Sequence, residues 1–188
     1  MKYLKLLAVL FISSIIVTSC SDDDSPEHIH DEEVITTMKV VLTPDTGDAV
    51  TLEWKKIEED TEPEITEGTL IANTTYSAVI TLLNETEDPA DNITNEVIAE
   101  AEEHQFFYNA TDITSTFTYS DNDANDNPLG VEFTIQTGAT GTGTYTITLK
   151  HEPNKLGTNV KDGDITNAGG ETDIEVVFPI TVIDMVPL

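Results

Sequence analysis

The chain has 188 residues, and its 36 acidic against 8 basic residues give a formal net charge of −28 at pH 7. Nucleic acids and anionic lipids bind clustered Lys and Arg, and bidentate capture of a phosphate or carboxylate needs Arg. All eight basic residues are Lys. The composition therefore excludes nucleic acid, makes anionic substrates poor candidates, and favours cations, metals and cationic partner surfaces.

The N-terminal segment is typical of a secretory signal. Lys2 and Lys5 precede an apolar run over residues 6–17, which is too short to span a bilayer comfortably. The run ends in Val17-Thr18-Ser19-Cys20, which resembles the bacterial lipobox. Cys20 is the only cysteine, so it has no internal disulfide partner. We predict a lipoprotein signal peptide over residues 1–19 and a membrane anchor of palmitate-type acyl chains on Cys20; the alternative is a signal cleaved elsewhere.

Residues 20–33 are expected to form a flexible acidic tether, because they are polar and lack a periodic apolar pattern. The run Ser21-Asp22-Asp23-Asp24 resembles the signal that sends Bacteroidota-type lipoproteins to the outer face of the outer membrane. The resemblance implies an outer-membrane protein that faces the cell surface. A plain solvated linker is the alternative, since acidic low-complexity stretches are commonly disordered.

The remaining residues, 34–188, suit a single domain with one core. Short stretches of β-branched residues or of apolar–polar alternation recur between turn residues, and we expect strands over residues 34–43, 49–54, 68–71, 76–83, 105–108, 114–119, 131–135, 145–151 and 172–183. About eight or nine such strands predict an antiparallel all-β domain, either an Ig-like β-sandwich or a partly closed barrel. The lack of strand–helix alternation argues against a Rossmann-like or periplasmic-binding α/β fold.

Residues 89–103 interrupt the strands with one short helix or an irregular insertion. In a helix, one face would carry Ile93, Val97, Ala101 and His104, although residues 97–99 also suit a strand. The last turn of that helix would be crowded with glutamates, whose negative charge opposes the helix dipole by about 0.3–1 kcal/mol each. A bound cation would offset this conflict.

A first candidate site combines imidazole and carboxylate groups from two segments: Glu102, Glu103, His104, His151 and Glu152. This chemistry suits zinc above all, and also copper or iron. The two histidines are 47 residues apart, so a shared site depends on the fold to bring them together. The alternative is a solvated acidic face with two unrelated histidines. His28 and His30 in the tether form a weaker His-x-His possibility.

A second candidate site is an Asp-rich stretch with oxygen ligands at alternating places: Asp121, Asp123, Asn125, Asn127 and, at the twelfth place, Glu132. The stretch resembles calcium-binding loops. Asp126 stands at the sixth place, where an EF-hand loop has Gly, and no flanking helices are expected. An ordinary hairpin turn is the alternative, because turns use the same residue types.

No motif of an enzyme is present in the sequence. The chain has no Gly-x-Ser-x-Gly elbow, no phosphate-binding Gly loop with Lys and no dinucleotide fingerprint. Carboxylates are too abundant for an acid–base pair to be chosen among them. We therefore predict a protein that is not an enzyme.

Several stretches resemble a family of small Bacteroidota-type surface lipoproteins. They are residues 33–38, 81–86, 102–108 (Glu-Glu-His-Gln-Phe-Phe-Tyr), 151–153 (His-Glu-Pro) and 169–174. The resemblance implies a surface lipoprotein that works beside a TonB-dependent outer-membrane receptor. Two hypotheses follow: a module that binds a metal ion or metal complex for such a receptor, or a structural, adhesive lipoprotein that binds a protein or glycan and uses calcium at most for rigidity.

Overall fold

The computed structural model describes residues 33–58 and 60–185, which belong to one compact unit, Glu32–Leu188. The predictions for the signal peptide, for Cys20 and for His28 and His30 lie outside the described residues. Within the described part of the chain, no helix has the length and apolarity needed to cross a membrane.

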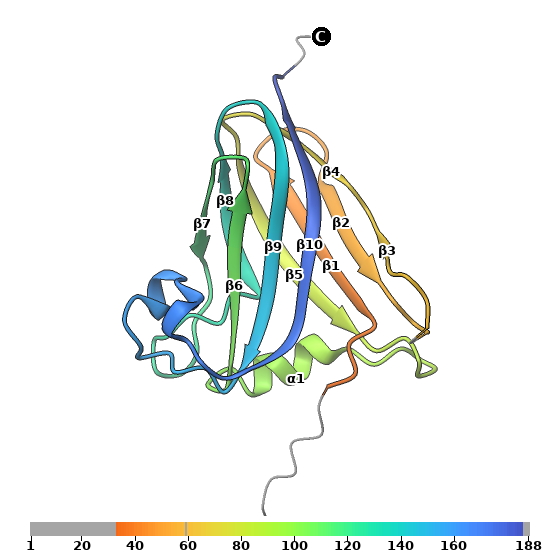
Figure 1. The fold of residues 1–188 in the computed structure, drawn as a ribbon, viewed down its shortest axis with the longest axis vertical. Helices are drawn as coiled ribbons and strands as arrows, with labels where there is room; N and C mark the ends of the chain where they lie inside the picture. Colours follow the sequence, from red (N-terminus) through yellow and green to blue (C-terminus); the bar gives the residue numbers. More distant parts are fainter. Residues whose placement is uncertain (1–32, 59, 186–188) are drawn as a thin grey trace, which may run out of the picture. The chain divides into compact units, whose positions relative to one another are not determined.

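Two sheets pack face to face as a β-sandwich, with strands running along the same axis (Figure 1). The six-stranded sheet has the order β3-β2-β1-β5-β8-β7, and the four-stranded sheet has the order β4-β10-β9-β6. The strands are β1 (Thr37–Pro44), β2 (Val50–Lys55), β3 (Glu64–Ile65), β4 (Gly68–Ile71), β5 (Thr75–Leu83), β6 (His104–Thr111), β7 (Ser115–Tyr119), β8 (Glu132–Thr137), β9 (Gly141–His151) and β10 (Glu171–Ile183).

The predicted β-sandwich is confirmed, and the two sheets do not close into a barrel. Strand alternation explains the core: every second residue of β10, from Ile174 to Val182, is buried between the sheets. Two details differ from the prediction. The two-residue strand β3 adds a tenth strand among the described residues, and β4 pairs with β10 in parallel.

The predicted helix is present but shorter than the 89–103 segment. Helix α1 (Ile93–Ala99) buries Ile93 and Val97, and the buried Thr94 hydroxyl accepts a hydrogen bond from Leu82 N at 2.7 Å. Residues 100–103 form a turn, and His104 is the first residue of β6. The expectation that His104 extends the helical face is therefore wrong. Figure 1 shows α1 across the end of the sandwich where β6 begins and β9 ends.

The polar segment 154–170 forms a separate lobe beside β6 (Figure 1). It contains two short 3-10 helices, η1 (Val160–Asp162) and η2 (Ile165–Asn167). Phe107 of β6 packs with Val160 and Ala168 in a small second core. Gln105 of β6 also donates a hydrogen bond to Val160 O at 3.0 Å, so the lobe is fixed to the four-stranded sheet.

Candidate metal centre

The fold brings the two histidines together. Strands β6 and β9 pair antiparallel, and His104 lies directly opposite His151 in their register. Residues opposite each other on neighbouring strands have their side chains in contact range. The centroids of the two imidazole rings are 4.7 Å apart, with an angle of 34° between the ring planes.

A bulge at the start of β10 adds a carboxylate to the histidine pair. The β9–β10 register shifts between Thr172 and Ile174, and such bulges redirect side chains. Asp173, at the shift, faces both rings: its Oδ2 is 3.8 Å from His104 Nε2 and its Oδ1 is 3.8 Å from His151 Nδ1. Gly170 permits this tight corner, because its φ is +64° and a side chain there would collide with His151 O.

A second carboxylate comes from the segment that precedes β1. Glu33 Oε1 lies 3.7 Å from His104 Nε2, and the Glu33 side chain is only 11% exposed. Its other oxygen, Oε2, is buried and has no hydrogen-bond partner among the described residues. Burial, the nearby charge of Asp173 and those of Glu96 and Glu100 raise the pKa of Glu33 to about 7.

The orientation of the His104 ring is set by the end of α1. Glu100 is the C-cap of the helix, and its carbonyl oxygen lies 3.2 Å from His104 Nδ1. A carbonyl accepts only, so Nδ1 carries the proton and Nε2 carries the lone pair. His104 is fully buried, and within the described part of the chain its Nε2 has no hydrogen-bond partner. Burial lowers the pKa of His104, although the Glu100 carbonyl opposes the shift, which favours the neutral ring that a metal requires.

The separations between these groups fit a shared cation better than hydrogen bonds. Distances of 3.7–3.8 Å from His104 Nε2 to the two carboxylates exceed hydrogen-bonding range. Ligand atoms 2.0–2.2 Å from a tetrahedral zinc are about 3.3–3.6 Å apart. A contraction of a few tenths of an ångström would therefore bring either carboxylate to the separation expected of two ligands on one ion bound at His104 Nε2. Glu33 lies close enough to His104 and Glu100 to hold a metal with them. His104, His151 and Asp173 also lie close enough to one another to hold a metal.

The predicted site residues divide into three sets. His104 and His151 form the centre of the cluster. Glu103 and Glu152 make an outer group with His151, in which Glu103 Oε2 is 3.9 Å from His151 Nε2. Glu102 is exposed and belongs to none of the potential metal-binding groups found among the described residues.

Sequence reasoning missed Asp173, Glu33 and the Glu100 carbonyl. Asp173 and Glu33 are two of 36 acidic residues, and no local motif distinguishes them. The strand bulge and the packing of the segment before β1 create their roles.

The Asp-rich stretch is a turn whose carboxylates already have partners. Asp121 accepts hydrogen bonds from Gly130 N at 2.6 Å and Glu132 N at 3.0 Å. Asp123 accepts hydrogen bonds from Asn125 N and Asn127 N, both at 2.9 Å. These oxygens organise the backbone of the turn, and Glu132 is exposed on β8. A calcium site there stays a prediction, with its carboxylate oxygens engaged by the protein itself.

A lysine supplies the positive charge at this turn. The buried Lys155 ammonium donates hydrogen bonds to Asp123 Oδ2 at 3.0 Å, to Ala101 O at 2.5 Å and to Pro128 O at 3.0 Å. Burial alone would raise the pKa of Asp123, but hydrogen bonds from Asn127 and from Lys155 together hold it below its ordinary value. Burial also lowers the pKa of Lys155, against the opposing effect of Asp123.

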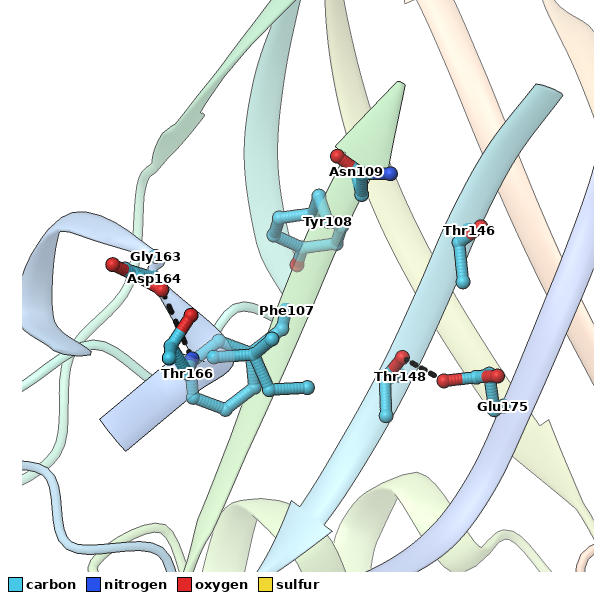
Figure 2. A pocket seen from close by; sticks show the side chains of 10 residues that line it. Phe107, Tyr108, Asn109, Thr146, Thr148, Gly163, Asp164, Thr166 and Glu175 are labelled. Atoms are coloured by element: carbon cyan, nitrogen blue, oxygen red, sulfur yellow. Dashed lines mark hydrogen bonds between the residues drawn. The ribbon is translucent and has the colours of Figure 1, made fainter. Parts of the chain in front are cut away.

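A separate cleft of about 450 Å³ lies between the lobe and the outer face of the four-stranded sheet. Figure 2 shows Asp164 and Thr166 of the lobe on one side, and Thr148 and Glu175 of the strands on the other. Thr148 donates a hydrogen bond to Glu175 at 3.0 Å, and Asp164 accepts one from Thr166 N at 2.9 Å. The lining thus offers hydroxyl and carboxylate groups, with no basic residue among them.

The side chains around His104 are suited to binding a metal ion. Two groups of imidazole and carboxylate donors share His104, one with His151 and Asp173 and one with Glu33 and Glu100. Each is suited to a transition metal, with zinc the best match. Comparisons of the chain with known protein families, with curated proteins and with solved structures find no match.

Proposed function

We propose that this protein is a metal-binding lipoprotein of the outer membrane, and that His104, His151 and Asp173 bind the ion. The observation that carries the proposal is the buried His104 ring, whose Nδ1 is held by Glu100 O and whose Nε2 points at two carboxylates at 3.7 and 3.8 Å. A buried polar atom without a partner is costly, by about 1–3 kcal/mol. A metal ion bound at Nε2 would remove that cost.

The donor set supports zinc first, then copper or iron. Neutral imidazole and carboxylate are borderline and hard ligands, and zinc binds both at about 2.0–2.2 Å. The site is a small, largely buried group of side chains, which suits capture of an ion better than turnover of a substrate. The lipidated Cys20 would hold the protein at the membrane, and the resemblance to surface lipoproteins supports delivery of the ion or its complex to a TonB-dependent receptor.

The first experiment measures the metal content of residues 21–188, a form without a His tag that contains the whole compact unit. The protein is equilibrated with a mixture of zinc, copper, iron and calcium, freed of unbound ions and analysed for metals. We expect about one equivalent of a transition metal, and its loss in His104→Ala. Absence of any transition metal from the unsubstituted protein would refute the proposal.

Two further variants keep this test decisive. Because His104 is buried, His104→Ala could lose metal by misfolding, so the less buried His151→Gln serves as a second variant, with circular dichroism as a check of the fold. The matched control is the double variant His28→Ala/His30→Ala, which removes the tether histidines. We expect the control to keep its metal; a loss there would place the ion in the tether.

A second candidate function is the capture of a neutral glycan, favoured by the cleft of Figure 2. Its hydroxyl and carboxylate groups match the hydroxyls of a sugar, and its volume lies in the usual range of ligand sites, about 300–1,000 Å³. Titration with neutral oligosaccharides, followed by calorimetry, would test it. Binding lost in Glu175→Gln but kept in His104→Ala would support an adhesive role, with calcium at most structural.

A further inference from the structure

The position of Glu33 in the chain has a consequence for the proposed metal site. Within the described part of the chain, backbone hydrogen bonds begin at Thr36, whose N–H donates to Leu83 O at 2.9 Å. Glu33 lies three residues before this anchor, in the segment that connects the N-terminal region to β1. The other groups of the cluster, in contrast, come from β6, β9 and β10 of the opposite sheet.

The side chain of Glu33 is placed where an anion is poorly accommodated. It is 89% removed from solvent, its Oε2 is buried without a hydrogen-bond partner among the described residues, and Glu96 and Glu100 add negative charge nearby. A carboxylate in such surroundings costs free energy unless a cation or proton compensates it. A metal ion at His104 Nε2, 3.7 Å from Glu33 Oε1, would supply the missing charge.

We propose that Glu33 is a further ligand of the metal and that the bound ion fastens the segment before β1 to the four-stranded sheet. The inference rests on the proposed metal binding and adds to it a coupling between the ion and the N-terminal segment. One ion would then join both sheets at the end of the sandwich closed by α1.

This coupling also limits where the ion is held relative to the membrane. Glu33 follows Cys20 by 13 residues, and a fully extended chain spans about 3.3–3.6 Å per residue. The Cα atom of Glu33 therefore lies at most about 47 Å from that of an acylated Cys20, and an ion bound to the Glu33 side chain lies at most a few ångströms farther. A receptor in the same membrane would meet the ion within that distance.

The first arm of the test compares zinc affinities by calorimetry in residues 21–188. We expect Glu33→Gln to weaken zinc binding by more than the roughly 10–100-fold lost when an outer-shell partner is removed. The matched control is Glu96→Gln, which removes a nearby negative charge from an exposed helix position but no ligand atom. An equal loss in both variants would reduce the role of Glu33 to general electrostatic attraction and would overturn the inference.

The second arm follows the mobility of the segment itself. Residues 21–188 contain no cysteine, so Val34→Cys, at a position 56% exposed, gives a unique site for a spin label. The control label is placed at Val79→Cys, which is 45% exposed on β5. We expect zinc to immobilise the label at position 34 and not at position 79, and to lose this effect when Glu33→Gln is added.

The outcomes separate the inference from the function on which it rests. Zinc bound with unchanged affinity in Glu33→Gln, and no change in the label at position 34, would overturn the role of Glu33 and leave a metal site made by His104, His151 and Asp173. Failure of the unsubstituted protein to bind zinc or another transition metal would overturn both.

Discussion

The cluster around His104 and the turn from Asp121 to Glu132 are both rich in carboxylates, but among the described residues only the turn has a lysine paired with a carboxylate. There, the Lys155 ammonium is bonded to Asp123 and to two backbone carbonyls. In the cluster, Glu33 faces His104 and Asp173 faces both histidines, and burial lowers the pKa of His104.

In the turn, the protein itself compensates the buried charge of Asp123. In the cluster, no described residue compensates a charge on Glu33 in the same way. A buried charge is tolerated when it is paired and its remaining hydrogen bonds are made. Asp123 meets both conditions with groups of the protein, whereas Glu33 meets neither among the described residues. A stretch that resembles a calcium loop can therefore be a turn whose carboxylates are already compensated by groups of the protein. The cluster around His104, which has no recognised motif, is the better candidate for binding an external ion.

The largest effect is expected from removal of the internal cation. Lys155→Met keeps most of the length of the side chain but leaves the buried Asp123 carboxylate without its charged partner. Breaking a buried ion pair in this way costs about 3–5 kcal/mol. Urea denaturation of residues 21–188 would measure the loss.

The control for this substitution is Lys161→Met, which removes an exposed lysine of η1. Surface changes of this kind usually alter stability by less than about 0.5 kcal/mol. If both variants lose less than about 0.5 kcal/mol of unfolding free energy, Lys155 does not compensate the charge of Asp123. The proposed difference between the turn and the cluster would then be wrong.

The next effect is the response of the two regions to added ions. Zinc at 100 times its dissociation constant should stabilise the protein by about 2.7 kcal/mol, or roughly 5–10 °C in melting temperature. Calcium should stabilise far less, because the Asp121 and Asp123 oxygens already accept hydrogen bonds. Scanning calorimetry with each ion checks this. A larger shift with calcium, kept in His104→Ala, would reverse the assignment.

Much of the fold was predictable from local patterns, and the missing parts have identifiable causes. The alternation in β10, from Ile174 to Val182, marked a strand buried on one face. The exposed strand β3 has no such pattern. The predicted helix was too long, because residues 100–103 continue its apolar spacing at Ala101 while turning away from α1.

The site was predictable only in part, for reasons of register and tertiary packing. His104 and His151 were chosen for their chemistry, but strand register, which puts them opposite each other, cannot be read from one strand alone. Asp173 depends on a bulge, and Glu33 on the packing of a non-strand segment. Lys155 is one of eight lysines in a polar chain, and nothing near it in the sequence indicates burial.

The turn should also have its own acid dependence. Hydrogen bonds and Lys155 hold the pKa of Asp123 below its ordinary value of 3.8, so the unfolded chain takes up this proton first on acidification. The stabilisation is therefore present above about pH 4 and is lost as the pH falls through the pKa of the folded state. A hydrogen-bonded charge contributes about 1.5–3 kcal/mol. Denaturation curves from pH 2 to 6 should show a shallower decline in Asp123→Asn; identical slopes would contradict this account.

The smallest effect distinguishes two neighbouring glutamates. Glu103 Oε2 lies 3.9 Å from His151 Nε2, whereas Glu102 lies outside the potential metal-binding groups of the described residues. A carboxylate that accepts a hydrogen bond from a metal-bound histidine orients the ring, and loss of such a partner costs about 10–100-fold in affinity. At 3.9 Å, Glu103 would have to move closer to His151 to make that bond. Since Glu103 is 47% exposed, we expect Glu103→Gln to weaken zinc binding by only about tenfold, or 1.4 kcal/mol, and Glu102→Gln to leave it unchanged. Both variants remove one negative charge from the same turn, so an equal loss would mean that zinc responds to the charge of the surface and not to the orientation of His151.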